Sequence, residues 1–252
     1  MRARQPRARG QHFLRSSALA ADIVRAAGIA PGDLVVDLGA GTGMLTSALA
    51  RAGAEVVAVE LDPALAAALR ERFPRVIEGD ARRVPLPCEP FRVVANLPFE
   101  GGTEILRRLV EEAQLVSADV IVQWELAHKR SAVWPSTALG VIWGASFELT
   151  LVRRLPPEVF APPPTVDAAV LRLVRRPEPL VPAAERRRYA QFVQSGFRQG
   201  VRRVAAPLTL KRLARELGFP QRPRPCDLDA RQWAALYGHV MAGLVASGRD
   251  RI

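Results

Sequence analysis

Leu34-Val35-Val36-Asp37-Leu38-Gly39-Ala40-Gly41-Thr42-Gly43 is an apolar, β-branched run that ends in alternating glycines. The run predicts a buried strand, and the glycines let the backbone turn tightly and approach a ligand without a Cβ atom in the way. Residues 44–50 then follow a helical pattern. A glycine turn between a parallel strand and a helix favours a nucleotide-like ligand, because free backbone amides meet the carboxyl end of the sheet there.

Strand-like and helix-like stretches alternate on both sides of this turn. Helical patterns cover residues 43–52, 62–72 and 103–112, and apolar runs predict further strands at 55–60, 76–80, 91–96, 118–124, 147–152 and 168–174. This alternation is typical of an α/β fold. It predicts a mostly parallel sheet with right-handed crossovers, closed by an antiparallel pair.

The remaining segments predict how the chain is divided. Residues 125–145 are mostly helical with an interruption near Pro135, and residues 184–247 are helical by pattern after a proline-rich linker. Tyr189, Phe192, Val193 and Phe197 recur at helical spacing and are expected in the core of that helical part. We therefore expect a flexible basic arm at 1–10, a catalytic domain at 11–176 and a small all-α domain at 177–252.

Charge points to a polyanionic partner. The 252 residues carry a formal net charge of +11, and residues 185–252 alone hold 14 basic against five acidic side chains. The arm adds Arg2, Arg4, Arg7 and Arg9 without an acid. Phosphate contacts supply most non-specific affinity for nucleic acids, so this excess favours nucleic acid over a membrane surface.

The sequence lacks the features of membrane-spanning, secreted, disulfide-rich and metal-binding proteins. Neither a run of 18 apolar residues nor a signal-type N-terminus is present, so a soluble cytoplasmic protein is the expectation. Cys88 and Cys226 lie far apart, and the three histidines have no ligand spacing. We expect neither a disulfide framework nor a metal site.

Two acidic residues end the next two strands. Glu60 follows Gly41 by 19 residues, where a carboxylate can accept both hydroxyls of a ribose bound across the sheet. Asp80 ends the third strand, where it can accept the exocyclic amine of an adenine in the same cleft. Taken singly, each residue could also be an ordinary strand-end or turn carboxylate.

Asn96-Leu97-Pro98-Phe99 at the end of the fourth strand suits methylation of an exocyclic amine. The lone pair of such an amine is delocalised into the ring. The Asn96 side-chain oxygen and the Leu97 carbonyl can hold its two N–H groups and favour a pyramidal nitrogen, while Pro98 stiffens that carbonyl. Phe99 offers a ring on which an extruded base can stack. A nicotinamide dehydrogenase would explain the glycine turn and Glu60, but not this tetrapeptide or the basic ends.

Together these segments resemble the ribosomal RNA adenine-N6 methyltransferases, which comprise the erythromycin-resistance (Erm) enzymes and the small-subunit dimethyladenosine transferases. The resemblance spans about Gly10 to Gly243. It is carried by Gln11-His12-Phe13-Leu14, Asp37-Leu38-Gly39-Ala40-Gly41-Thr42-Gly43, Val59-Glu60-Leu61-Asp62, Gly79-Asp80-Ala81, Asn96-Leu97-Pro98-Phe99 and Phe160-Ala161-Pro162-Pro163-Pro164-Thr165-Val166-Asp167.

The resemblance implies a fold, a cofactor and a set of site residues. The fold is the class I S-adenosylmethionine-dependent methyltransferase fold, Rossmann-like with a seven-stranded, mostly parallel sheet, and the helical C-terminal domain at 177–252 would bind RNA. S-adenosylmethionine would lie at positions matching Gln11, His12, Leu14, Gly39, Ala40, Gly41, Glu60, Leu61, Asp80, Ala81 and Asn96. Catalysis would fall to Asn96, Leu97, Pro98 and Phe99, and RNA contacts to Arg4, Arg7, Arg9, Phe160, Arg198, Arg202 and Arg203. For Phe160 a core-packing role is the alternative, and for the three C-terminal arginines a solvated basic face.

The motifs look closer to the Erm branch, since the first one has Asp-Leu-Gly-Ala-Gly where small-subunit enzymes usually carry Glu-Ile-Gly-Pro-Gly. Residues 224–237 also resemble actinobacterial-type Erm proteins. The branch implies a monomer that methylates one adenine of protein-free 23S rRNA and blocks macrolides, lincosamides and streptogramin B. A 16S rRNA dimethyladenosine transferase and a catalytically silent RNA-binding protein are the alternatives. One departure stands out: Gln123 is followed by Trp124, where the family usually has a basic residue.

Overall fold

The structure is a computed structural model that describes residues 11–246 and forms two compact units. Within that part, the first unit holds residues 11–127 and 150–174, and the second holds 128–149 and 175–246. The arm at 1–10, with Arg4, Arg7 and Arg9, lies outside the described residues. The border differs from the expected ranges 11–176 and 177–252, because residues 128–149 pack with the C-terminal helices.

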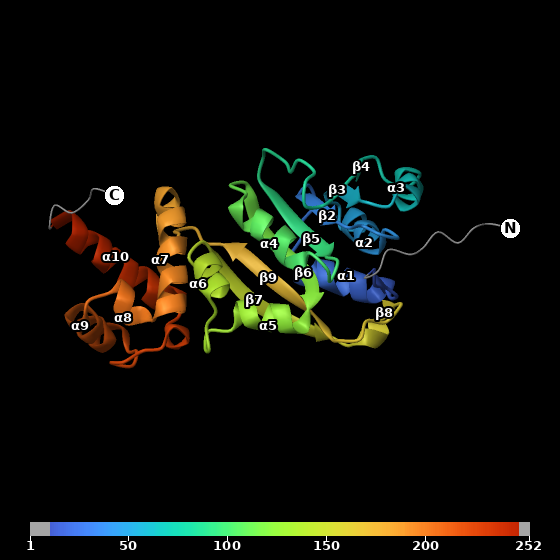
Figure 1. Ribbon diagram of the computed structural model, residues 1–252. Helices are drawn as coiled ribbons and strands as arrows, with labels where there is room; N and C mark the ends of the chain where they lie inside the picture. Colours follow the sequence, from blue (N-terminus) through green and yellow to red (C-terminus); the bar gives the residue numbers. More distant parts are fainter. Residues whose placement is uncertain (1–10, 247–252) are drawn as a thin grey trace. The chain divides into compact units, whose positions relative to one another are not determined.

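A seven-stranded sheet forms the centre of the first unit, in the order β4-β3-β2-β5-β6-β9-β7 (Figure 1). Neighbours from β4 to β6 pair in parallel, and β9 runs antiparallel to β6. The predicted mostly parallel sheet is therefore confirmed. The strands are β2 (Leu34–Leu38), β3 (Glu55–Glu60), β4 (Val76–Glu78), β5 (Phe91–Asn96), β6 (Leu115–Gln123), β7 (Phe147–Leu155) and β9 (Ala168–Arg175).

Helices follow the strands as the pattern predicts. They are α1 (Ser17–Ala26), α2 (Met44–Arg51), α3 (Pro63–Arg70), α4 (Gly102–Glu111) and α5 (Trp124–Ser131), with a 3-10 turn at Pro157–Val159. Ser16 caps α1 by accepting a hydrogen bond from the Leu19 amide, and Asp62 caps α3 ahead of Pro63. Helices α1 and α2 pack with β2, β5, β6 and β9 into one apolar core, so the β2–α2 turn rests on a rigid base.

One pairing was not foreseen from the sequence. The short strands β1 (Phe13–Leu14) and β8 (Phe160–Ala161) pair antiparallel, with Leu14 opposite Phe160 and Phe13 opposite Ala161. The Arg15 amide extends the contact to the Val159 carbonyl at 2.9 Å. Two of the quoted motifs, separated by about 150 residues, thus lie side by side.

The second unit is helical around its own core. It contains α6 (Ala138–Gly144), α7 (Arg186–Gln199), α8 (Val201–Val204), α9 (Pro207–Leu217) and α10 (Ala230–Ala246), with 3-10 turns at Ala183–Glu185 and Pro225–Asp227 (Figure 1). Tyr189, Phe192, Val193 and Phe197 belong to this core, as expected, and the rings of Phe192 and Phe197 contact Trp233. Helix α6 joins them through Val141 and Ala145. None of the helices described between residues 11 and 246 has the length and apolarity that crossing a bilayer requires.

Gly196 on α7 packs too closely against Trp233 to leave room for a side chain, which gives a first prediction. A Cβ atom at Gly196 would lie 2.3 Å from the Trp233 ring, whereas one at Gly238 on α10 would meet nothing within 4 Å. Gly196→Ala should lower the free energy of unfolding by about 1–3 kcal/mol through overpacking, although alanine favours helices. Gly238→Ala, the matched control, should raise it by up to ~1 kcal/mol. Urea denaturation of both variants checks this; equal shifts would contradict the packing.

A buried carboxyl gives a second prediction. Asp37 on β2 is 1 % exposed and accepts a 2.6 Å hydrogen bond from the Thr46 hydroxyl. Burial raises the pKa of Asp37 from 3.8 to about 7, and Glu60 adds to the rise. The folded protein therefore binds this proton more tightly than the unfolded chain does. The contribution of the bound proton to the free energy of unfolding is full at acid pH and is lost as the pH rises toward 7.

Asp37→Asn does not ionise and should lose this dependence. Between about pH 4.5 and 7, the free energy of unfolding of the wild type should fall relative to that of Asp37→Asn by on the order of 1 kcal/mol per pH unit. Urea titrations at several pH values measure the difference. Parallel curves for the two proteins would show that Asp37 has an ordinary pKa.

Candidate active site

A cleft of about 390 Å³ opens in the first unit where β2, β3, β4 and β5 end. Its walls come from the segment before β1, from the glycine turn and from the residues that end three neighbouring strands. The sequence-predicted residues that line it are Gln11, His12, Gly39, Gly41, Glu60, Leu61, Asp80, Ala81, Asn96, Leu97, Pro98 and Phe99. The parallel sheet brings them together because the carboxyl ends of its strands meet at one edge.

The glycine turn is shaped for a close approach. Gly39 and Gly41 have φ values of +77° and +58°, which L side chains rarely adopt. A Cβ atom at Gly41 would lie 2.7 Å from the Phe13 ring. The turn therefore needs glycine both for its backbone and for the aromatic ring that the β1 strand lays against it.

Glu60 is buried and held by backbone amides. Its Oε2 accepts a hydrogen bond from the Gly41 amide at 2.7 Å, and its Oε1 accepts one from the Asp62 amide at 2.9 Å. The side chain is thus fixed at the end of β3, facing the cleft, with a second lone pair on each oxygen. A diol that enters the cleft meets an already oriented carboxylate.

Asp80 is paired with Arg82. The guanidinium donates to both carboxylate oxygens, the shortest contact being 2.6 Å from Nη2, and the Arg82 amide donates at 2.9 Å. These contacts hold the pKa of Asp80 at about 2, so the carboxylate is ionised at any physiological pH. Arg82 also reaches Glu104 of α4 at 3.6 Å, and both residues line the cleft.

Asn96 ends β5 with an oriented amide. Its Nδ2 donates to the His12 carbonyl at 2.7 Å, and since a carbonyl only accepts, this contact fixes which way the amide lies. The Asn96 Oδ1 is buried without a hydrogen-bond partner among the described residues. An unpaired buried acceptor is costly, which makes it a receptor for a ligand donor.

Aromatic rings border the Asn96 side of the cleft. Phe99 contacts His12, whose ring lies 5.1 Å away between centroids, and His12 Nδ1 donates to the Pro162 carbonyl at 2.8 Å. Phe160 lies edge-on to Phe99 at 6.4 Å and is fully buried in the core. Phe160 therefore packs against Phe99 and does not line the cleft. This packing agrees with the alternative that Phe160 is a core residue.

Trp124, which stands where the family usually has a basic residue, contacts an arginine of β7. The Arg154 guanidinium lies over the Trp124 ring, 5.4 Å from its centroid, and is ion-paired with Asp167. The Trp124 amide donates to the Asp167 carbonyl at 2.9 Å. A cation from β7 thus lies beside Trp124, the residue at which the family usually has a basic side chain.

Some predicted residues lie elsewhere, and some lining residues were missed. Leu14 and Ala40 are buried in the core and are not among the residues that line the cleft. Arg198, Arg202 and Arg203 are exposed on α7 and α8 of the second unit. Phe13, Arg82 and Glu104 also line the cleft, although the sequence does not single them out as site residues. Of these three, only Phe13 lies inside a quoted motif. Residues 11–246 contain no cluster of three potential metal ligands.

Comparison with known proteins names the group. A family model described as ribosomal RNA adenine dimethylase matches residues 4–217. Mycinamicin-resistance protein MyrB of Micromonospora griseorubida is 34% identical over 238 residues, which cover 90% of this chain and 76% of the relative. Ribosomal RNA small subunit methyltransferase A of Synechococcus sp. (strain JA-3-3Ab) is 36% identical over 256 residues, 92% of this chain and 91% of the relative.

A solved structure supports the same assignment. The 23S rRNA methyltransferase ErmE superposes with a TM-score of 0.80 at 28% identity, covering 91% of this chain and 99% of that one. The expected class I methyltransferase fold is thereby confirmed. Because the family model spans most of the chain and its motifs meet around one cleft, the chain belongs to the ribosomal RNA adenine N6-methyltransferases.

Proposed function

We propose that this protein transfers a methyl group from S-adenosylmethionine to the N6 amine of one adenine in 23S rRNA, and that the modification confers resistance to macrolides, lincosamides and streptogramin B. The observation that carries the proposal is the unpaired, buried Oδ1 of Asn96, a residue that lines the cleft. This oxygen has a fixed orientation and can accept a hydrogen bond from an N–H donor. The resistance function is supported by the relative named for mycinamicin resistance and by the likeness to ErmE.

The residues present fit S-adenosylmethionine. Glu60 would accept the ribose hydroxyls, Asp80 the adenine amine, and the turn at Gly39 and Gly41 would pass close to the ligand without side chains. Gln11, His12, Leu61 and Ala81 would complete the walls. The bound cofactor supplies an electrophilic methyl group on a sulfonium sulfur.

The chain's own part in the reaction is to hold the acceptor amine. Asn96 Oδ1 and the Leu97 carbonyl would accept the two N–H groups, which favours a pyramidal nitrogen with its lone pair toward the methyl group. Phe99 would stack the extruded base, with Phe160 and His12 fixing the ring. No strong base is required, because the aminium product loses its proton readily.

The 23S rRNA assignment rests on the Asp37-to-Gly43 motif and on residues 224–237. A second candidate is methylation of 16S rRNA during subunit assembly, which the 36% identity to a small subunit methyltransferase A favours. We further propose that the protein is a cytoplasmic monomer and binds the RNA before the subunit is assembled.

A methyl-transfer assay separates the candidates. Labelled S-adenosylmethionine is offered with protein-free 23S rRNA and with small-subunit particles, and primer extension then locates the modified base. Label on one adenine of the free 23S rRNA supports the proposal. Label only on the particle would replace it by the 16S candidate, and label on neither would point to another RNA substrate or to an RNA-binding protein without turnover.

Asn96→Ala should lose rate while keeping most of its affinity for cofactor and RNA. Removing one acceptor of a hydrogen bond made in the transition state should lower kcat by about 10- to 100-fold. Single-turnover methylation measures the rate, and calorimetry with S-adenosylhomocysteine measures binding. Gln114→Ala, which removes an exposed side-chain amide that does not line the cleft, serves as a control. Unchanged kcat in Asn96→Ala would remove the proposed role.

Asp80→Ala should weaken cofactor binding by about tenfold, because one charge-assisted hydrogen bond to the adenine amine is lost. Glu78→Ala is the matched control. Glu78 ends the same strand and is also paired with an arginine, Arg70, but it does not line the cleft. Calorimetry with S-adenosylhomocysteine compares the two variants. Equal losses would indicate a general charge effect and contradict a specific contact by Asp80.

A further inference from the structure

A basic groove of about 180 Å³ lies in the second unit, apart from the residues assigned above. It is formed by the loop 132–137, by α6 and by the start of α10. Its lining includes three arginines, Arg130, Arg176 and Arg231, one acidic residue, Asp229, and Val133 and Ser136 of the loop. Arg176 is ion-paired with Glu148 at 2.8 Å, and Arg231 is exposed.

Trp134 belongs to the same loop and follows Val133, which lines the groove. It is 60% exposed, and it is the one Phe, Tyr or Trp in the exposed class among residues 11–246. Trp124 is partly exposed, and Trp143 and Trp233 are buried. Large rings are usually covered, so an exposed tryptophan beside arginines is a candidate contact for a ligand with a flat apolar face.

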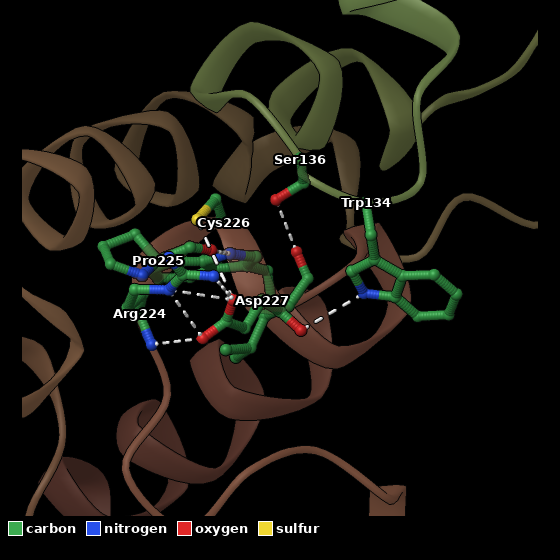
Figure 2. Close-up of polar contacts among 8 residues, drawn as sticks. Trp134, Ser136, Arg224, Pro225, Cys226 and Asp227 are labelled. Atoms are coloured by element: carbon green, nitrogen blue, oxygen red, sulfur yellow. Dashed lines mark hydrogen bonds and ion pairs between the residues drawn. The ribbon is translucent and has the colours of Figure 1, made fainter.

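The structure holds this ring in place (Figure 2). The Trp134 Nε1–H donates to the Asp227 carbonyl at 3.2 Å. Two residues on, Ser136 donates its amide to the Cys226 carbonyl at 2.9 Å and its hydroxyl to the Leu228 carbonyl at 2.6 Å. The only polar atom of the indole is therefore satisfied by the protein, and what the ring offers to a ligand is its π-face.

Charge decides what kind of ligand fits. Residues 128–149 and 175–246 hold 16 arginines and lysines against six acidic residues. Asp227, whose carbonyl holds Trp134, also binds Arg224 through its carboxylate at 2.8 Å, and that arginine is 78% exposed (Figure 2). An aromatic face among arginines is the arrangement that binds single-stranded nucleic acid, where bases stack and phosphates meet cations.

We propose that Trp134 and the basic groove form a second RNA-binding site, in which an unpaired base stacks on the indole and its neighbouring phosphates lie against the groove arginines. The identification of this RNA as rRNA rests on the proposed function, whereas the binding of single-stranded RNA does not. The site uses residues of the second unit, none of which lines the cofactor cleft. It therefore acts on affinity for RNA and leaves the cofactor cleft untouched.

The test uses the full-length protein and a single-stranded oligoadenylate, because stacking tolerates any sequence. Trp134→Ala should weaken binding about 5- to 150-fold, the loss of one stacked base. Trp134→Phe should keep most of the affinity but lose the quenching of tryptophan fluorescence that the wild type shows on binding. Leu208→Ala, an apolar residue of α9 that is 83% exposed, should bind as the wild type does. Arg231→Ala should reduce the salt slope of log Kd by about 1.

Each outcome is decisive. Melting temperatures of the variants within a few degrees of the wild type exclude unfolding as the cause of weaker binding, and Trp134→Phe serves as the conservative rescue. If Trp134→Ala binds oligoadenylate as the wild type does, the inference is overturned, whatever the methylation assay on 23S rRNA gives. If sedimentation instead shows a wild-type dimer that Trp134→Ala dissociates, the ring is a contact with a second copy and the inference also fails.

Discussion

The antiparallel pairing of β1 with β8 is the constraint on which the cleft depends. Four paired residues hold the N-terminal motif across the carboxyl edge of the sheet. This pairing lays Phe13 against the glycine turn and brings the His12 carbonyl to the Asn96 amide. Without it, the ends of the parallel strands would still meet, but one wall of the cleft and the orientation of its central amide would be missing.

The sequence predicts most of what local chemistry decides. The apolar runs and glycine turn give the parallel sheet, and the spacing of Glu60, Asp80 and Asn96 brings them to one edge because each ends a strand. Leu14 and Ala40 were assigned to the cofactor through resemblance alone. Both side chains turn into the core, since a motif does not tell which of its side chains face the ligand.

Long-range contacts explain what could not be predicted. A two-residue strand such as β1 has no periodicity, and its partner lies about 150 residues away. Likewise, Arg82 gives no motif signal, and its role follows only from the position of Asp80 in space. The placement of α6 with the C-terminal helices is of the same kind: its apolar residues fit either core, and packing with α7 and α10 decides.

The contact between Asn96 and the His12 carbonyl also bears on which base the cleft can accept. Because the amide nitrogen is already used, only an oxygen faces the cleft at that point. A base with a carbonyl in place of the amine, such as hypoxanthine, would set its lone pairs against those of this buried oxygen. A hydrogen bond from the Asn96 side chain to a main-chain carbonyl would thus act as a filter between amino and keto bases before any methyl group moves.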